Sequence, residues 1–138
     1  MRGTDSIDNR QDVIDSRDVI ERIKTLTDER DSFEPADVEE GETPETWADN
    51  NPDDAEELKA LESLAAEASG AADWKYGEAM IRDSYFKEYA QQLADDIGAI
   101  NKAAEWPNNC IDWDEAAELL QQDYWTVDFD GVQYWIRG

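Results

Sequence analysis

The chain has 138 residues, and its 36 Asp and Glu against 12 Lys and Arg, with no His, give a net charge of −24. Such an excess repels other polyanions, so the composition argues against direct binding to DNA, RNA or an anionic membrane. A surplus of this size is expected with a strongly basic protein partner, with high salt, or with disordered acidic segments.

The remaining composition indicates one small folded domain, with or without an appendage. Twelve of the 14 aromatic residues lie after position 70, so most of the folded mass is expected there. Cys110 is the only cysteine, which excludes an intramolecular disulfide and a cysteine-based metal site. Neither a signal-peptide pattern nor an apolar run of bilayer-spanning length is evident, so we expect a soluble cytoplasmic protein.

The first 30 residues are close to charge balance, with eight acids and six bases. Apolar residues at helical spacing predict a helix over 16–30, with Ser16 as its N-cap. The buried face of this N-terminal helix, within the segment 1–30, is expected to consist of Val19, Ile20, Ile23 and Leu26.

The middle of the chain is its most acidic part. Residues 31–51 carry two prolines and a glycine among acids and show no periodicity, which predicts an acidic linker. A second helix is predicted over 52–70, with Asn51 as its capping residue. The two helices are expected to pair as an antiparallel hairpin. The apolar stripe of the second helix is expected to comprise Leu58, Leu61, Ala65 and Ala68.

Residues 71–138 are predicted to form a small α+β domain. Residues 76–82 fit either a strand or the start of a helix. Helices are predicted over 84–97 and 112–123, and a β-hairpin with a tight turn at 130–131 follows. The second of these helices is expected to bury Ala116, Leu119 and Leu120. The predicted fold class is therefore α+β: an N-terminal helical hairpin, then two helices and a C-terminal β-hairpin.

An ordered series of short segments carries a resemblance to a known family. These segments are YFKEYAQQLADD at 85–96, WP at 106–107, IDWDEAA at 111–117, DY at 123–124 and VDFDGVQYW at 127–135. Through them, residues 82–137 resemble the C-terminal part of the ArdA family of antirestriction proteins, which phages and mobile elements carry. The resemblance implies an acidic, elongated, dimeric inhibitor that mimics duplex DNA. It would occupy the DNA groove of a type I restriction-modification enzyme and perform no chemistry of its own.

ArdA proteins are longer and carry further domains before this one, whereas residues 1–70 here are predicted to form a helical hairpin and linker. The resemblance therefore admits a different target with the same kind of basic channel, such as a CRISPR effector.

The carboxylates are the candidate partner-binding groups. Duplex DNA carries about one negative charge per 1.7 Å of axis, and an acidic protein of suitable shape competes for the channel that binds it. Because an exposed ion pair contributes at most about 1 kcal/mol, no single carboxylate is expected to be essential. The candidates are Asp53, Asp54, Glu56 and Glu57, then Glu88, Asp95, Asp96, Asp112, Asp114, Glu115, Glu118, Asp123, Asp128 and Asp130. The second helix also offers Glu62 and Glu67.

No catalytic, cofactor or metal site is predicted. The chain lacks His, a phosphate-binding loop and a nucleophile motif. The pairs Asp112/Asp114 and Asp128/Asp130 are interpreted as a helix cap and a turn, because the remaining ligands of a calcium loop are missing.

The leading hypothesis is a non-enzymatic DNA mimic that blocks a host defence nuclease in the host cytoplasm. Homodimerisation stays open, because the aromatic residues between 106 and 135 suit either a core or a dimer interface. Two alternatives also stay open. One is an adaptor that binds a protein through the apolar stripe of a helix, and the other is an acidic halophile protein without mimicry.

Overall fold

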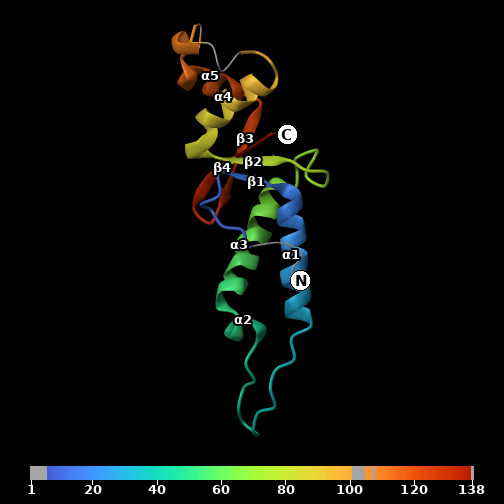
Figure 1. The fold of residues 1–138 in the computed structure, drawn as a ribbon. Helices are drawn as coiled ribbons and strands as arrows, with labels where there is room; N and C mark the ends of the chain where they lie inside the picture. Colours follow the sequence, from blue (N-terminus) through green and yellow to red (C-terminus); the bar gives the residue numbers. More distant parts are fainter. Residues whose placement is uncertain (1–5, 101–104, 107, 138) are drawn as a thin grey trace.

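A small sheet lies in the middle of an elongated molecule and separates two pairs of helices (Figure 1). The computed structural model describes residues 6–100, 105, 106 and 108–137. The helices α1 and α3 pack on one face of the sheet, and α4 and α5 pack on the other. The predicted α+β class is confirmed.

The helices and strands follow one another in a mixed order along the chain. Their bounds are β1 Val13–Asp15, α1 Ser16–Asp31, α2 Trp47–Asn50, α3 Pro52–Ala68, β2 Ala79–Arg82, α4 Phe86–Asp96, α5 Trp113–Gln121, β3 Tyr124–Phe129 and β4 Val132–Arg137. Two 3-10 turns, η1 Asp83–Tyr85 and η2 Asn108–Cys110, precede α4 and α5.

The four strands pair antiparallel in the order β1-β2-β4-β3. Ile14 lies opposite Met80, and Met80 lies opposite Ile136, so one row of side chains crosses three strands on one face. All three side chains are buried. Their neighbours Ile81 and Trp135 form a row on the opposite face. The short strand β1 therefore attaches the N-terminal segment to the same sheet as the C-terminal hairpin.

The predicted β-hairpin forms around the Asp130–Gly131 turn. Both residues have positive φ, at 50° and 85°, as a two-residue turn between twisted strands requires. Asp tolerates this conformation better than most residues, and Gly adopts it without a steric cost. The Asp128 carboxylate accepts a hydrogen bond from the Gly131 N–H at 3.3 Å and closes the turn.

The larger core lies between the sheet and the antiparallel pair α1/α3. Val19 and Leu26 of α1 meet Leu58, Leu61 and Leu64 of α3, and all five are at most 3% exposed. These residues also contact the sheet face that carries Ile14 and Met80. The predicted helical hairpin is therefore present, and its apolar stripes are used within the fold.

The core between the sheet and the pair α4/α5 is smaller. Its buried members are Ile81, Phe86, Ala90 and Ala117. The Phe86 ring meets Tyr124 edge-on at a centroid distance of 5.3 Å and Trp135 at 5.7 Å. Contacts between aromatic rings therefore fill much of this smaller core. We call this part of the molecule (residues 83–123) the head.

The N-cap of α1 differs from the prediction, whereas that of α3 is Asn51 as predicted. The N-cap of α1 is Asp15, whose carboxylate accepts from the Arg17 N–H at 2.8 Å. Ser16 is instead buried, and its hydroxyl donates to the Trp74 carbonyl and accepts from the Glu78 N–H. Asn51 occupies the N-cap position of α3 without a side-chain bond to that helix, because its amide donates to the Trp47 carbonyl at 3.0 Å.

Several expected core positions are also different. Ile20 is 38% exposed, and the buried charged position on α1 is Arg22. On α3, Leu64 is buried and Ala65 only half-buried. On α5 the buried residue is Ala117, whereas Leu119 is 60% exposed. The expected burial of Ala116 and Leu120 is only partial.

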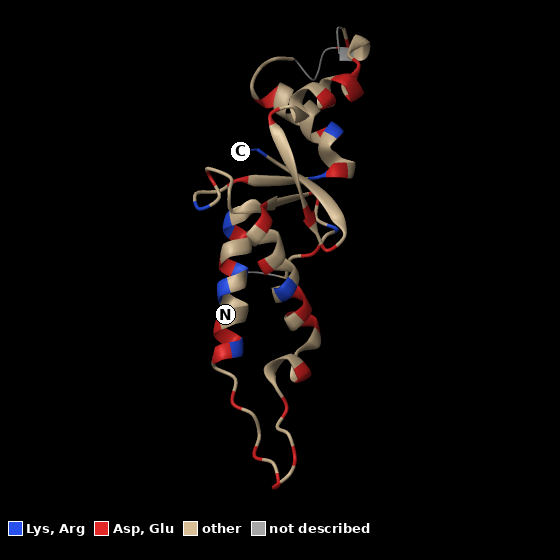
Figure 2. Ribbon diagram, turned by 180° about the vertical axis from the view of Figure 1, so that it is seen from behind, with Lys and Arg blue, Asp and Glu red and all other residues tan. Residues whose placement is uncertain are grey.

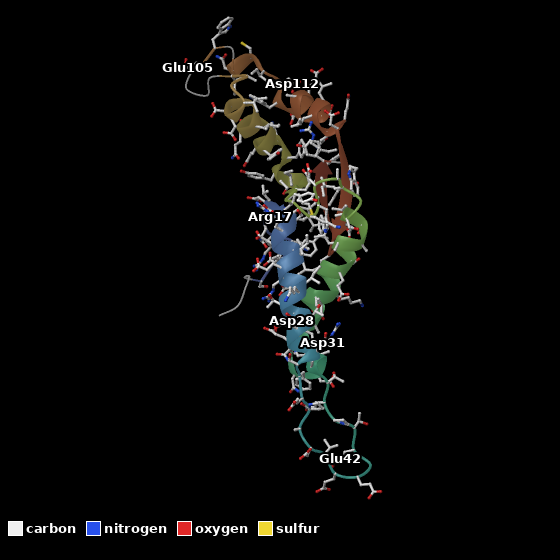
Figure 3. All side chains as sticks on the ribbon, turned by 90° about the vertical axis from the view of Figure 1, so that its right-hand side faces the viewer. Arg17, Asp28, Asp31, Glu42, Glu105 and Asp112 are labelled. Atoms are coloured by element: carbon white, nitrogen blue, oxygen red, sulfur yellow. The ribbon has the colours of Figure 1, made fainter. Side chains whose placement is uncertain are left out.

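The predicted linker contains one helical turn. Thr46 and Asp49 form a reciprocal capping box around α2, and Trp47 is buried against α3. The preceding residues 32–46 form an acidic loop without regular structure, exposed except for half-buried Phe33. The tip of this loop, at Glu42, lies at the opposite end of the molecule from Asp112 (Figure 3). The segment that fitted either a strand or a helix contains β2.

We predict that Phe86→Ala unfolds the head selectively. Removing a large buried aromatic costs about 3–5 kcal/mol, and the small core of the head has few other contacts to compensate. Hydrogen-exchange mass spectrometry should show faster exchange in α4 and α5, with protection retained in α1 and α3. A matched Leu119→Ala variant should exchange like the wild type, because that side chain is exposed. Equal loss of protection in both helix pairs would contradict the division into two cores.

Candidate acidic interaction surface

The charges of α1 are largely compensated. The helix carries five acids and four bases, and Figure 2 shows the two signs interleaved along it. Arg17 pairs with Asp15 at 2.8 Å, and Lys24 pairs with Asp28 at 2.9 Å. The exposed side of α1 is therefore a poor template for a run of phosphates.

The exposed side of α3 is acidic. Apart from Glu57, which pairs with buried Arg22, five acids against Lys59 alone leave four net negative charges on its 17 residues, which span about 25 Å. That is one charge per about 6 Å of axis, against about one per 1.7 Å in duplex DNA. A surface with the charge density of DNA therefore needs carboxylates from segments beside α3.

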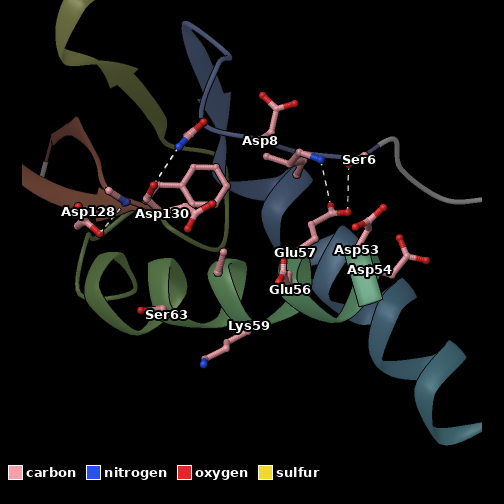
Figure 4. Close-up of a pocket in the computed structure, with 15 residues that line it drawn as sticks. Ser6, Asp8, Asp53, Asp54, Glu56, Glu57, Lys59, Ser63, Asp128 and Asp130 are labelled. Carbon is pink, nitrogen blue, oxygen red and sulfur yellow. Dashed lines mark hydrogen bonds between the residues drawn. The ribbon is translucent and has the colours of Figure 1, made fainter. Parts of the chain in front are cut away.

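Two neighbouring segments supply such carboxylates around a groove of about 690 Å³. The groove lies between residues 6–9, the first half of α3 and the β3–β4 turn (Figure 4). The Asn9 amide donates to the Asp130 carbonyl at 3.0 Å and fixes the two flanking segments to each other. Lys59 is the one cation among the lining residues. We call this site the acidic groove; its carboxylates are Asp8, Asp53, Asp54, Glu56, Glu57, Asp128 and Asp130.

The groove joins predicted site residues that lie far apart in the sequence. Asp53, Glu56, Asp128 and Asp130 are exposed, and Asp54 is half-buried. Asp8 was not among the predicted residues. No local pattern marks it, because it reaches the groove only through the packing of the N-terminal segment.

Glu57 has a different role from the other carboxylates of the groove. It forms a two-pronged ion pair with Arg22 of α1, with Nε–Oε2 at 2.7 Å and Nη2–Oε1 at 2.9 Å. The same carboxylate accepts from the Ile7 N–H at 3.0 Å and the Ser6 hydroxyl at 3.1 Å. The Arg22 side chain is fully buried, and that of Glu57 is 9% exposed. The charge of Glu57 is therefore neutralised inside the fold.

The ionised form of Glu57 is stabilised by this pairing. Burial raises the pKa of the carboxyl, but the hydrogen bonds from Arg22 and Ile7 outweigh it, so the pKa of Glu57 lies below its ordinary value. The pKa of Arg22 is raised by the same pair, against its own burial. Asp54 adds a third charge, with Oδ1 3.7 Å from Arg22 Nη2.

Of the remaining predicted residues, Glu62 and Glu67 are exposed on α3 outside the groove. The others belong to the head, on the other side of the sheet (Figure 1). Asp112 caps α5 by accepting from the N–H groups of Asp114 and Glu115, each at 3.1 Å. Lys87 pairs with Asp114 at 3.1 Å. Those that are exposed are Glu88, Asp96, Asp112, Asp114, Glu115, Glu118 and Asp123, and Asp95 is half-buried. The predicted residues thus form two separate acidic surfaces.

Comparison with protein-family models, curated proteins and solved structures finds no match to this chain. The resemblance of residues 82–137 to the ArdA family therefore stays a prediction. Within the described residues, no cluster of His, Cys, Asp or Glu has the arrangement of a metal site. No helix in that part of the chain has the length and apolar character needed to cross a bilayer.

We predict strong coupling between Arg22 and Glu57. Either Arg22→Met or Glu57→Met breaks the buried pair and leaves the other charge without its main partner, which costs about 3–5 kcal/mol. The double variant removes both charges and should be more stable than either single variant by at least about 2 kcal/mol. Urea denaturation of the four proteins gives the coupling energy. Additive losses would show that the pair is not a unit.

We also predict a specific pH dependence for this pair. Because the pKa of Glu57 is lowered in the fold, its contribution is complete above its unfolded pKa, about 4.3, and is lost as pH falls through the folded value. The stability difference between wild type and Glu57→Gln should therefore be constant above about pH 5.5 and shrink below about pH 4. Urea denaturation from pH 3 to 7 measures it. The exposed Glu62→Gln control should differ from wild type by less than about 0.5 kcal/mol throughout.

Proposed function

We propose that this protein is an acidic DNA mimic, a non-enzymatic inhibitor of a host defence nuclease. It would act in the host cytoplasm by occupying the basic channel in which the nuclease binds DNA. Suitable targets are a restriction-modification enzyme, in keeping with the ArdA resemblance, or a CRISPR effector.

The observation that carries the proposal is the one-sided placement of charge on ordered elements. The acidic groove gathers carboxylates from three segments, whereas the acids of α1 lie among bases. A mimic needs fixed charges on the side that enters the channel, because opposite fields then accelerate encounter and set register. The elongated shape supports the same proposal, since the DNA site of a nuclease is a long channel.

The two alternatives are less well supported by the arrangement of residues. An adaptor that uses a helical stripe needs a row of exposed apolar residues on α1 or α3. Leu26, Leu58 and Leu61 are buried between those helices, and Ile20 alone does not form a row. A halophile protein needs acids on every face for hydration, whereas the acids of α1 lie among three exposed bases.

The test is inhibition of two purified enzymes, a type I restriction-modification enzyme and an RNA-guided DNA nuclease. We expect one of them to be inhibited. The inhibition should weaken with rising salt, because salt screens the carboxylates. Excess duplex DNA should relieve it, because DNA binds the same basic channel.

Two variants with equal charge change separate the groove from net charge. The groove variant should bind about 10- to 100-fold more weakly, because it loses three exposed ion pairs worth at most about 1 kcal/mol each. The control should stay within about 3-fold of wild type, because Lys24 already pairs with Asp28 and all three acids lie outside the groove. The groove variant carries Asp53→Asn, Glu56→Gln and Asp130→Asn, and the control carries Asp18→Asn, Glu21→Gln and Asp28→Asn.

If both variants weaken binding equally, the loss depends on net charge alone, which would contradict the role of the groove. Inhibition that persists in saturating duplex DNA would contradict mimicry altogether.

A further inference from the structure

The outer face of α5 combines an exposed apolar side chain with uncompensated acids. Leu119 is 60% exposed, which makes it the most exposed large apolar residue within the described helices. Helical periodicity predicted that it would be buried, yet α5 turns Ala117 inward instead. The inward residues Trp113, Ala116, Ala117 and Leu120 follow ordinary helical spacing, so Leu119 is left on the outer face.

Acidic residues lie near this leucine. Glu115 lies one helical turn before it, Glu118 lies on the neighbouring side of the helix, and Asp123 lies in the turn after α5. All three are exposed, and none makes an ion pair within the described part of the chain. The helix itself contains no Lys or Arg.

The acids near the end of α5 are unfavourable for the isolated helix. Its C-terminus carries a partial negative charge, and basic residues normally occupy the last turn. Here the last turn has none, and Asp123 follows directly. The charge of Asp123 therefore does not stabilise the helix, whereas it would attract a basic partner.

We propose that the outer face of α5 is a docking surface for a basic protein surface that contains an apolar pocket. Leu119 enters the pocket as the anchor, and Glu115, Glu118 and Asp123 face the surrounding Lys and Arg side chains. A central apolar anchor with a charged rim is the usual distribution of binding energy in protein interfaces. The charge of this face also argues against a second copy of this chain as the partner, because that contact would bring like charges together.

This inference rests on the proposed function in one respect: the basic surface belongs to the inhibited nuclease. It adds an anchor that electrostatic mimicry alone does not require. The face lies across the sheet from the acidic groove, so the two surfaces are tested separately.

The first experiment uses the nuclease that is inhibited by the wild-type protein. Leu119→Ala should weaken inhibition at least about 10-fold without changing its salt dependence, because no charge is removed. Glu115→Gln/Glu118→Gln should reduce the salt dependence. Unchanged inhibition by Leu119→Ala would overturn the inference and leave the proposed function standing.

The second experiment does not depend on the nuclease. The probe is an 18-residue amphipathic helical peptide of Lys and Leu, and its control is a Lys/Ala peptide of equal charge. In 15N-labelled protein, we expect the Lys/Leu peptide to shift amide signals of residues 115–123, and Leu119→Ala to weaken this binding at least about 10-fold. The Lys/Ala peptide should bind at least about 10-fold more weakly than the Lys/Leu peptide.

Three results would overturn the docking surface. They are shifts confined to the acidic groove, equal binding of both peptides, and α5 signals that move with protein concentration before peptide is added. The last result would identify the face as a contact between copies of this chain. Peptide binding at α5 without inhibition of either nuclease would support the docking surface and contradict the proposed function.

Discussion

The ion pair between Arg22 and Glu57 connects three parts of the molecule that the rest of the fold depends on. It joins α1 to α3, and through Ser6 and Ile7 it holds the segment that leads into β1. A buried guanidinium is tolerated only when its charge is matched, so this contact restricts how the two helices can face each other. The chain thereby uses a cation inside the fold while nearly all of its carboxylates stay at the surface. The elongated shape separates those carboxylates and lowers their mutual repulsion.

The sheet relates the two acidic surfaces to each other. One face carries the large aliphatic core of α1 and α3, and the other carries the smaller, aromatic core of the head. The acidic groove is built beside the first core and the outer face of α5 beside the second. In the proposed function, the rigid groove imitates phosphates and the head supplies apolar contact. Electrostatic attraction then governs encounter, and burial of Leu119 governs how long the complex lasts.

Features with a local origin were predictable from the sequence, and features that join distant segments were not. The helices near 16–30 and 52–70 follow from apolar spacing, and the hairpin follows from Asp130–Gly131. Strand β1 has only three residues and pairs with a strand 66 positions later, so no local pattern marks it. Of the groove, the acids on α3 and in the turn were predicted as candidates, but their proximity and the membership of Asp8 depend on tertiary packing. The inward position of Arg22 likewise depends on Glu57, 35 residues away.

The acidic loop between α1 and α2 has a consequence for how such proteins diversify. Both of its ends are held by packed helices, so changing its length leaves the remaining structure in place. Doubling the length of a flexible loop costs only about 0.6 kcal/mol in closure entropy. Each two residues added would move its tip outward by up to about 3.5 Å. Insertions and deletions here therefore offer evolution a way to adjust reach and negative charge by small steps, independently of the residues that maintain the fold.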